Sequence, residues 1–220
     1  MPRERVELFR VSNTIPKEKI IVLAFEGNDT ERIYFSDLKD DVKFENDIIH
    51  LYLLIRPKND TKSAPIHVFN KLKKEIKEEY NLDVADELWM IVDKDNWQNI
   101  PEIIELCKNE SNFFVALSNP CFELWLLLHI IDIKQFTEQE QNKILDNKKI
   151  SNSKNYIDRV LGSVVNGGYN KTNPRPERFL PYINDAISRA EDLDDKSEDY
   201  PSKLGTHVYK VAKKILNISK

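Results

Sequence analysis

The sequence predicts an α/β protein in which a mainly parallel sheet is flanked by helices and followed by a mostly helical C-terminal part. Three observations predict this fold class. Short apolar or β-branched segments alternate four times with segments of helical periodicity before residue 132. The linkers between them are short, which requires parallel strands joined by right-handed crossovers. After Asp132, polar helical segments take over and no strong strand pattern appears.

Four segments have the composition of strands. The first, Lys19–Phe25, is a continuous apolar run of the kind that is buried on both faces of a parallel sheet. The second, Asp47–Ile55, is rich in β-branched residues. The third and fourth are Glu87–Val92 and Phe113–Leu117. Each is followed by a segment of a different periodicity, so together they predict a layered sheet of Rossmann-like type.

The four intervening segments have helical spacing. They are Thr30–Leu38, Ile66–Tyr80, Ile100–Lys108 and Pro120–Ile130. A proline stands near the start of the second and third, where a missing N–H is tolerated. The fourth is apolar nearly all round, which predicts a buried helix. We therefore expect an α/β core over residues 16–132 and a mostly helical extension over residues 133–220 that packs on it.

Composition limits the classes of function. The 220 residues include 33 Lys and Arg against 37 Asp and Glu, so the formal net charge is −4. A polyanionic partner would therefore have to meet a local basic patch. Two cysteines exclude a disulfide framework and fit a reducing compartment.

The chain shows no targeting or membrane signal that we recognise. The charged N-terminus, MPRERVELFR, lacks the apolar core of a signal peptide. The most apolar later run, Leu124–Ile131, is far too short to span a bilayer. We expect a cytoplasmic protein without a membrane partner.

Carboxylates follow two of the predicted strands. Glu26 ends the first strand, and Asp93 and Asp95 end the third. Residues i and i+2 of an extended chain point the same way, so these two aspartates share a face while Lys94 points away. In parallel sheets the carboxyl ends of strands meet at one edge, where ligands bind. Three carboxylates there repel unless a cation neutralises them, which favours Mg²⁺ over the alternative of solvated turns.

The turn after the first strand carries a second acid. Gly27 permits a tight turn, and Asn28, Asp29 or Thr30 caps the next helix. Glu31 then lies in the first helical turn, either as a favourable acid near the helix N-terminus or as a further metal ligand. The stretch EGNDTE has one glycine and no lysine, so neither a Walker loop nor a dinucleotide-binding turn fits.

These residues carry a family resemblance. A strand that ends in Glu-Gly with a following Thr-Glu, and a later strand that ends in Asp-x-Asp, resemble the Toprim domain. The segment SNPCFELWLLLH, Ser118–His129, resembles the hallmark of the RloB family, which is also represented by the AbiLii component of abortive-infection systems. Downstream, YNK (Tyr169–Lys171) and THVYK (Thr206–Lys210) are similar to C-terminal motifs of that family.

The resemblance implies a Toprim-like core and a role in bacterial antiphage defence. It implies phosphodiester chemistry around Mg²⁺ (or Mn²⁺), with Glu26 as ligand or general acid/base and with Asp93 and Asp95 as metal ligands. Some relatives have a second acid in the motif that begins with Glu-Gly, which implies that Glu31 is a further metal ligand. An ABC-type ATPase is implied as a partner. We see no topoisomerase tyrosine motif and no primase zinc module, so strand passage and priming are not expected.

Glu123 and His129 stand on the apolar fourth helix. A lone buried carboxylate is costly unless it is paired. Glu123 therefore either pairs with a basic residue inside the protein or completes the acidic cluster, since this helix starts at the same sheet edge. The resemblance favours the second reading. His129 lies deeper in the apolar face, and we expect it to be a core histidine with its hydrogen bonds satisfied rather than a ligand.

Basic residues in the C-terminal part are candidates for nucleic-acid contacts. Lys171 follows the pair Gly167-Gly168, and it is either an exposed loop lysine or a group that reaches the scissile phosphate. Arg175 and Arg178 extend a basic strip around two prolines, and Lys210 belongs to a second strip on the last helix. Charge runs are usually solvated faces, so we treat the strips as weak phosphate contacts.

Together these features predict a Mg²⁺-dependent nuclease that acts on RNA or DNA in antiphage defence with an ABC-type ATPase partner. Its predicted catalytic residues are Glu26, Asp93, Asp95, Glu123 and Lys171. The alternative is a non-catalytic regulatory or adaptor subunit of an ATPase-containing defence complex, which the net negative charge favours. The sequence does not distinguish DNA from messenger RNA or transfer RNA, and it indicates no oligomeric state.

Overall fold

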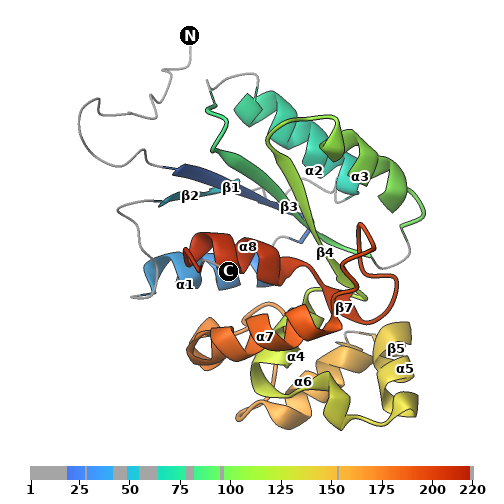
Figure 1. Ribbon diagram of the computed structural model, residues 1–220. Helices are drawn as coiled ribbons and strands as arrows, with labels where there is room; N and C mark the ends of the chain where they lie inside the picture. The colour runs from blue at the N-terminus through green and yellow to red at the C-terminus, as the bar shows by residue number, and fades with distance from the viewer. Residues whose placement is uncertain are drawn as a thin grey trace.

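The computed structural model describes residues 19–27, 29–41, 49–54, 64–77, 82–94, 97–152 and 154–218. In this part of the chain, five strands form one sheet in the order β2-β1-β3-β4-β7 (Figure 1). Their bounds are β1 (Lys19–Phe25), β2 (Ile49–Leu54), β3 (Glu87–Asp93), β4 (Phe113–Asn119) and β7 (Gly205–Thr206). The first four are parallel, and β7 is antiparallel to the end of β4. The predicted α/β, Rossmann-like, mainly parallel sheet is thus confirmed.

Helices cover both faces of the sheet. Their bounds are α1 (Thr30–Asp40), α2 (Pro65–Leu72), α3 (Ile100–Lys108), α4 (Glu123–Ile130), α5 (Glu138–Asp146), α6 (Tyr156–Val164), α7 (Ile183–Leu193) and α8 (Val208–Ile215). Shorter elements are the π-helix η1 (Lys73–Lys77), the 3₁₀ turns η2 (Ile133–Gln135), η3 (Pro176–Arg178) and η4 (Leu180–Tyr182), and the hairpin of β5 (Lys149–Ser151) and β6 (Lys154–Asn155). Figure 1 shows α2 and α3 on one face and α1 and α8 on the other.

Each face of the sheet has its own hydrophobic core. Ile21 and Leu23 of β1 pack on the face that carries α1, α4 and the C-terminal helices. Ile20 and Val22 pack on the opposite face, with α2 and α3. Successive strand residues point to opposite faces, so a strand between two helical layers must be apolar at every position. This explains the uninterrupted apolar run IIVLAF that follows Lys19.

The residues after Asp132 share a core with the sheet. Side chains of α6, α7 and α8 belong to the same cluster as those of β1, α1 and α4. β7 pairs with the end of β4, and the hydroxyl oxygens of Ser118 and Thr206 lie 2.7 Å apart. The Asn119 amide donates to the carbonyls of Pro201 and Ser202, both at 3.0 Å. The C-terminal part therefore holds the carboxyl end of β4 in place.

Three details differ from the expectation. The helix expected over Ile66–Tyr80 begins at Pro65 as α2 and changes to the π-helix η1 after Leu72. The helix expected from Pro120 begins at Glu123, because the preceding residues turn the chain and the Phe122 N–H donates to the Asp93 carboxylate. β7 was not expected, since two residues carry no periodicity.

Among the helices of the described residues, none combines the length and the apolar character that crossing a bilayer requires.

Candidate active site

Glu26 lies at the carboxyl edge of the sheet, where the sequence places it. β1 and β3 are paired through Phe25 and Ile91, so their ends lie side by side. The Glu26 carboxylate accepts hydrogen bonds from the Asp93 backbone N–H at 3.1 Å and from the Trp97 indole N–H at 2.8 Å. Its side chain is thereby directed across the end of β3.

Asp93 joins the same edge to the start of α4. Its Oδ1 accepts a hydrogen bond from the backbone N–H of Phe122 at 2.8 Å. A carboxylate that accepts N–H groups at a helix start is favourably placed. Asp93 therefore links Glu26, which its backbone N–H contacts, to the beginning of α4, which its side chain contacts. Asp95, the third predicted member, lies outside the described residues.

Glu31 is brought to the edge by the first turn of α1 and is 5% exposed. Burial, together with the negative charge of Glu123, raises its pKa to about 7. A carboxyl group of that pKa exchanges a proton near neutral pH, as a general acid or base must.

Gly27 makes room for this carboxylate. A Cβ at position 27 would collide with both carboxylate oxygens of Glu31. The glycine after Glu26 is thus explained by the close approach of a side chain rather than by a left-handed backbone.

Glu123 is the first residue of α4 and is 1% exposed. The Lys171 ammonium lies 3.0 Å from its Oε1, and the Tyr169 hydroxyl donates to the same oxygen at 3.1 Å. Burial alone raises the pKa of this carboxyl, but the Lys171 charge and a hydrogen bond from the Cys121 thiol outweigh it and hold the pKa below its usual range. Glu123 is therefore a buried, ionised carboxylate. The internal pairing with Lys171 is thus present, and the Glu123 charge also acts on Glu31. Its part in a metal-binding acidic cluster stays a prediction.

Lys171 reaches the cluster from a loop that is distant in the sequence. The loop is fastened to the start of α1, because the Thr30 hydroxyl donates to the Lys171 carbonyl at 2.8 Å. Burial alone would lower the Lys171 pKa, but the Glu123 carboxylate holds it above the usual range. The side chain is nevertheless 57% exposed, so a charged ammonium faces both the buried carboxylate and the solvent.

We call Glu26, Glu31, Asp93, Glu123 and Lys171 the strand-end cluster. Within the described residues, no group of three or more His, Cys, Asp or Glu side chains has the arrangement of a metal site. Glu26 and Asp93 nevertheless offer, at one edge, oxygen donors of the kind that Mg²⁺ or Mn²⁺ prefers. A metal site built from them with Asp95, which lies outside the described residues, stays a prediction.

The other predicted nucleic-acid contacts do not join the cluster. Arg175 is exposed and has a left-handed backbone, φ 55°. Arg178 donates to the Gly168 carbonyl at 3.2 Å. Lys210 of α8 pairs with Asp194 at 3.2 Å, and the buried Asp194 also holds His207 and Tyr209.

The second basic strip is largely neutralised by acids. Lys213 lies 3.2 Å from Glu191, and Lys214 lies 3.1 Å from Glu87. Because each of these lysines already has a carboxylate partner, this surface attracts phosphate weakly.

The expectation for His129 is confirmed. Its Nδ1 lies 2.8 Å from the Trp125 carbonyl, which only accepts, so Nδ1 carries the proton. Its Nε2, 2.9 Å from the Tyr34 hydroxyl oxygen, then accepts. Burial lowers the pKa of His129 to about 3, so the ring is neutral in the core.

Sequence reasoning missed three residues of the site. Tyr169 lies in the YNK segment, but a tyrosine in a loop gives no sign of its partner. Thr30 was considered only as a cap, and a tryptophan such as Trp97 is ordinarily expected to pack in the core or at its edge. Each donates a hydrogen bond to a distant residue of the cluster, and only the tertiary fold places the acceptor.

The chain was compared with models of protein families, with curated proteins and with solved structures. A family model described as RloB-like protein matches residues 21–215, which include every residue of the strand-end cluster. Neither the curated proteins nor the solved structures contain a match to the chain.

Proposed function

The chain belongs to the RloB-like family, which is associated with defence and abortive-infection systems, and we propose that it is a metal-dependent nuclease that acts in such defence. The observation that carries the proposal is the ion pair between the buried Glu123 and the half-exposed Lys171. It stands at the sheet edge that also holds Glu26 and Asp93. A fixed ammonium beside carboxylates at the ends of parallel strands is suited to bind a phosphate group.

Each member of the cluster has a role in this proposal. Lys171 binds the phosphate and offsets the charge that develops on it. Glu31, with a pKa of about 7, holds or releases a proton at neutral pH. Glu123 fixes the direction of the Lys171 ammonium and keeps it charged.

Glu26, Asp93 and Asp95 would hold the metal. When bound, Mg²⁺ or Mn²⁺ supplies a Lewis acid that polarises the phosphate and stabilises the leaving oxygen. The Trp97 indole orients Glu26, and the Phe122 N–H orients Asp93, so both carboxylates are fixed by their surroundings. The Toprim-like core and the ABC-type ATPase partner rest on the sequence resemblance and remain part of the proposal.

A regulatory or adaptor role is the second candidate. The observation that favours it is the pairing of Lys210, Lys213 and Lys214 with carboxylates, which leaves the last helix without free basic charge for nucleic acid. Under this alternative the chain binds the ATPase and has no metal affinity. Calorimetry with Mg²⁺ and Mn²⁺ separates the two candidates, because a catalytic site must bind metal at millimolar concentration or below.

The test of the nuclease proposal is cleavage of labelled RNA and DNA in Mg²⁺ or Mn²⁺, with and without the partner ATPase. We expect cleavage by the wild type and its loss in Glu26→Gln and Asp93→Asn. The matched control is Glu138→Gln, an exposed acid on α5. Cleavage that persists in both site variants overturns the proposal, as does metal binding without cleavage of either nucleic acid.

A further inference from the structure

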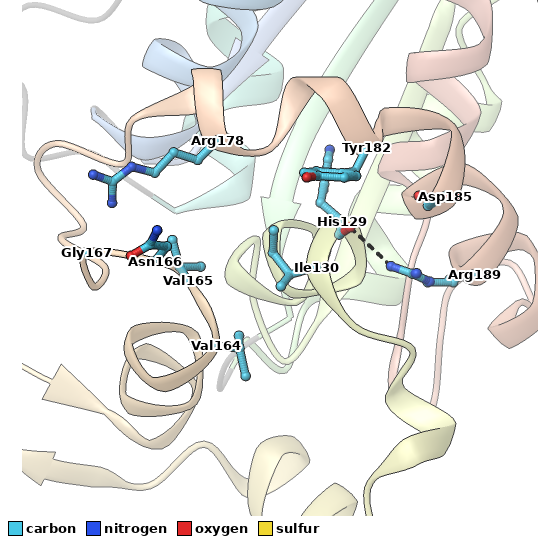
Figure 2. A pocket seen from close by; sticks show the side chains of 10 residues that line it. All are labelled: His129, Ile130, Val164, Val165, Asn166, Gly167, Arg178, Tyr182, Asp185 and Arg189. Atoms are coloured by element: carbon cyan, nitrogen blue, oxygen red, sulfur yellow. Dashed lines mark hydrogen bonds between the residues drawn. The ribbon is translucent and has the colours of Figure 1, made fainter.

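A cavity of about 610 Å³ opens in the C-terminal part of the protein, separate from the strand-end cluster. It lies between the end of α4, the residues after α6, and the segment from η3 to α7 (Figure 2). The strand-end cluster contributes no lining residue among those that the structure describes. Its volume is in the range of sites for small ligands.

Two arginines in this cavity have no acidic partner. Among the described residues, neither Arg178 nor Arg189 forms an ion pair, and both donate to backbone carbonyls instead. Asp185 lines the same cavity but pairs with neither of them. The lysines of the α8 surface, by contrast, are paired with carboxylates. Two arginines against the single carboxylate of Asp185 leave an excess of positive charge in a concave site, which points to an anionic ligand.

The two guanidinium groups are fixed before any ligand arrives. Arg178 donates to the Gly168 carbonyl at 3.2 Å, and Arg189 donates to the carbonyls of Leu128 and His129 at 2.6 and 3.1 Å. A guanidinium has five N–H donors, and these contacts use one terminal nitrogen of each. The remaining donors are available to oxygens of a ligand. Fixed donors bind phosphate with a smaller loss of side-chain entropy.

An aromatic ring lies between the arginines. Figure 2 shows Arg178 and Arg189 on opposite sides of the cavity, with Tyr182 between them and Asn166 below Arg178. The Tyr182 side chain is 50% exposed, so one part of its ring is free to stack. Aromatic rings stack on nucleobases, while an amide group can bond to a base edge.

We propose that this cavity binds a nucleoside that carries a phosphate at each end. The base stacks on Tyr182, and the two phosphates contact Arg178 and Arg189. Such a ligand is either a free nucleoside bisphosphate or one unit of a single-stranded nucleic acid. The site is additional to the proposed catalytic centre and does not depend on metal or on cleavage.

The loop between α6 and η3 connects the two sites. Gly167 and Gly168 have left-handed backbones, φ 80° and 76°, beside Arg178. Tyr169, which donates to Glu123, and Lys171 of the strand-end cluster follow in the same loop. α4 likewise begins at Glu123 in the cluster and ends at Ile130, which lines the cavity. The eight residues of α4 span roughly 12 Å. A single strand of nucleic acid held in the cavity would therefore lie about that far from Glu123.

Calorimetry without metal tests the proposal with adenosine 3′,5′-bisphosphate, adenosine 5′-monophosphate, adenosine and a short single-stranded oligonucleotide. We expect the bisphosphate to bind more tightly than the monophosphate, and adenosine to bind most weakly. Tyr182→Ala and Arg178→Gln should each weaken bisphosphate binding roughly tenfold or more. Arg159→Gln, an exposed arginine of α6 that lies over Tyr156 and outside the cavity, should bind like the wild type.

The ranking of the probes identifies the source of the ligand. Tighter binding of the oligonucleotide than of the bisphosphate indicates a unit of a single strand, and the reverse order indicates a free nucleotide. Circular dichroism establishes that each variant is folded. Of Tyr182→Ala and Arg178→Gln, the first is less prone to disturb folding, because the Tyr182 side chain is exposed. The proposal is overturned if folded wild-type protein binds none of the probes at millimolar concentration, or if both cavity variants bind the bisphosphate as the wild type does. Neither result depends on nuclease activity.

Discussion

The Lys171 ammonium lies 3.0 Å from the carboxylate of Glu123, although Lys171 stands on a half-exposed loop and Glu123 begins a buried helix. The pair keeps both groups charged, since it holds the pKa of Glu123 below and that of Lys171 above the usual range. It is therefore both the electrostatic centre of the strand-end cluster and the contact that joins the C-terminal loop to the sheet.

Replacing Lys171 with Met should destabilise the protein near neutral pH by roughly 1–3 kcal/mol, because it leaves the Glu123 carboxylate buried without a cation. The exposure of the Lys171 side chain keeps the loss below that of a fully buried pair. Chemical denaturation measures the difference in the free energy of unfolding. The control is Lys143→Met, an exposed lysine of α5.

The double variant Lys171→Met with Glu123→Gln should recover part of that loss, since a neutral amide in the core no longer requires the ammonium. If the loss in the free energy of unfolding of the double variant equals the sum of the losses in Lys171→Met and Glu123→Gln, the two side chains do not interact in solution.

Glu31 should give stability an unusual dependence on pH. Its pKa is raised from 4.5 to about 7 in the folded protein, so between these values the native state binds more protons than the unfolded state. Stability that depends on Glu31 must then fall as pH rises through this window and level off above it. Relative to Glu31→Gln, the wild type should lose on the order of 2–3 kcal/mol between pH 4.5 and 7.

Denaturation of both proteins at several pH values measures this difference, with Glu138→Gln as the exposed control. A wild type that gains stability over Glu31→Gln as the pH rises would contradict the assignment of a raised pKa.

Gly27→Ala should destabilise the protein and displace the Glu31 carboxylate, because a Cβ at position 27 collides with it. The colliding atoms are the end of the Glu31 side chain, which can rotate away, so the cost should lie at or below the lower end of the roughly 1–3 kcal/mol typical of overpacking. The matched control is Gly162→Ala in α6, where a Cβ meets nothing nearer than the Tyr169 backbone nitrogen at 3.9 Å. That variant should gain roughly 0.5–1 kcal/mol, because alanine favours a helix interior.

Thermal unfolding compares the two glycine variants directly. If Gly27→Ala unfolds at the wild-type temperature and also keeps the wild-type dependence of stability on pH, the Glu31 carboxylate does not approach Gly27 in solution.

Most of the sheet could be predicted because its signal is local. Strand β1 has the predicted bounds Lys19–Phe25, and helix α3 has the predicted bounds Ile100–Lys108, since continuous apolar runs and helical spacing are properties of neighbouring residues. The placement of Glu26 and Asp93 at one edge also follows from the sequence, because it is a consequence of parallel pairing.

The remaining features depend on long-range contacts. β7 is two residues long and exists because the end of β4 offers it a partner. Tyr169 and Thr30 carry no local sign of the acceptors they reach, Glu123 and the Lys171 carbonyl. Lys210 resembles a phosphate contact in the sequence but is paired with Asp194 once α7 and α8 pack together.

Metal-dependent cleavage is tested most directly by the single-turnover cleavage rate of end-labelled RNA and DNA as Mg²⁺ is titrated, with the ATPase partner present. We expect a rate that rises with Mg²⁺ and saturates in the wild type and in Glu138→Gln. In Glu26→Gln the rate should fall by about 100-fold or more, as is typical when a group that acts on the reacting phosphate is removed. A rate in Glu26→Gln equal to that of the wild type, or a wild type that cleaves neither nucleic acid at any Mg²⁺ concentration, would contradict the account.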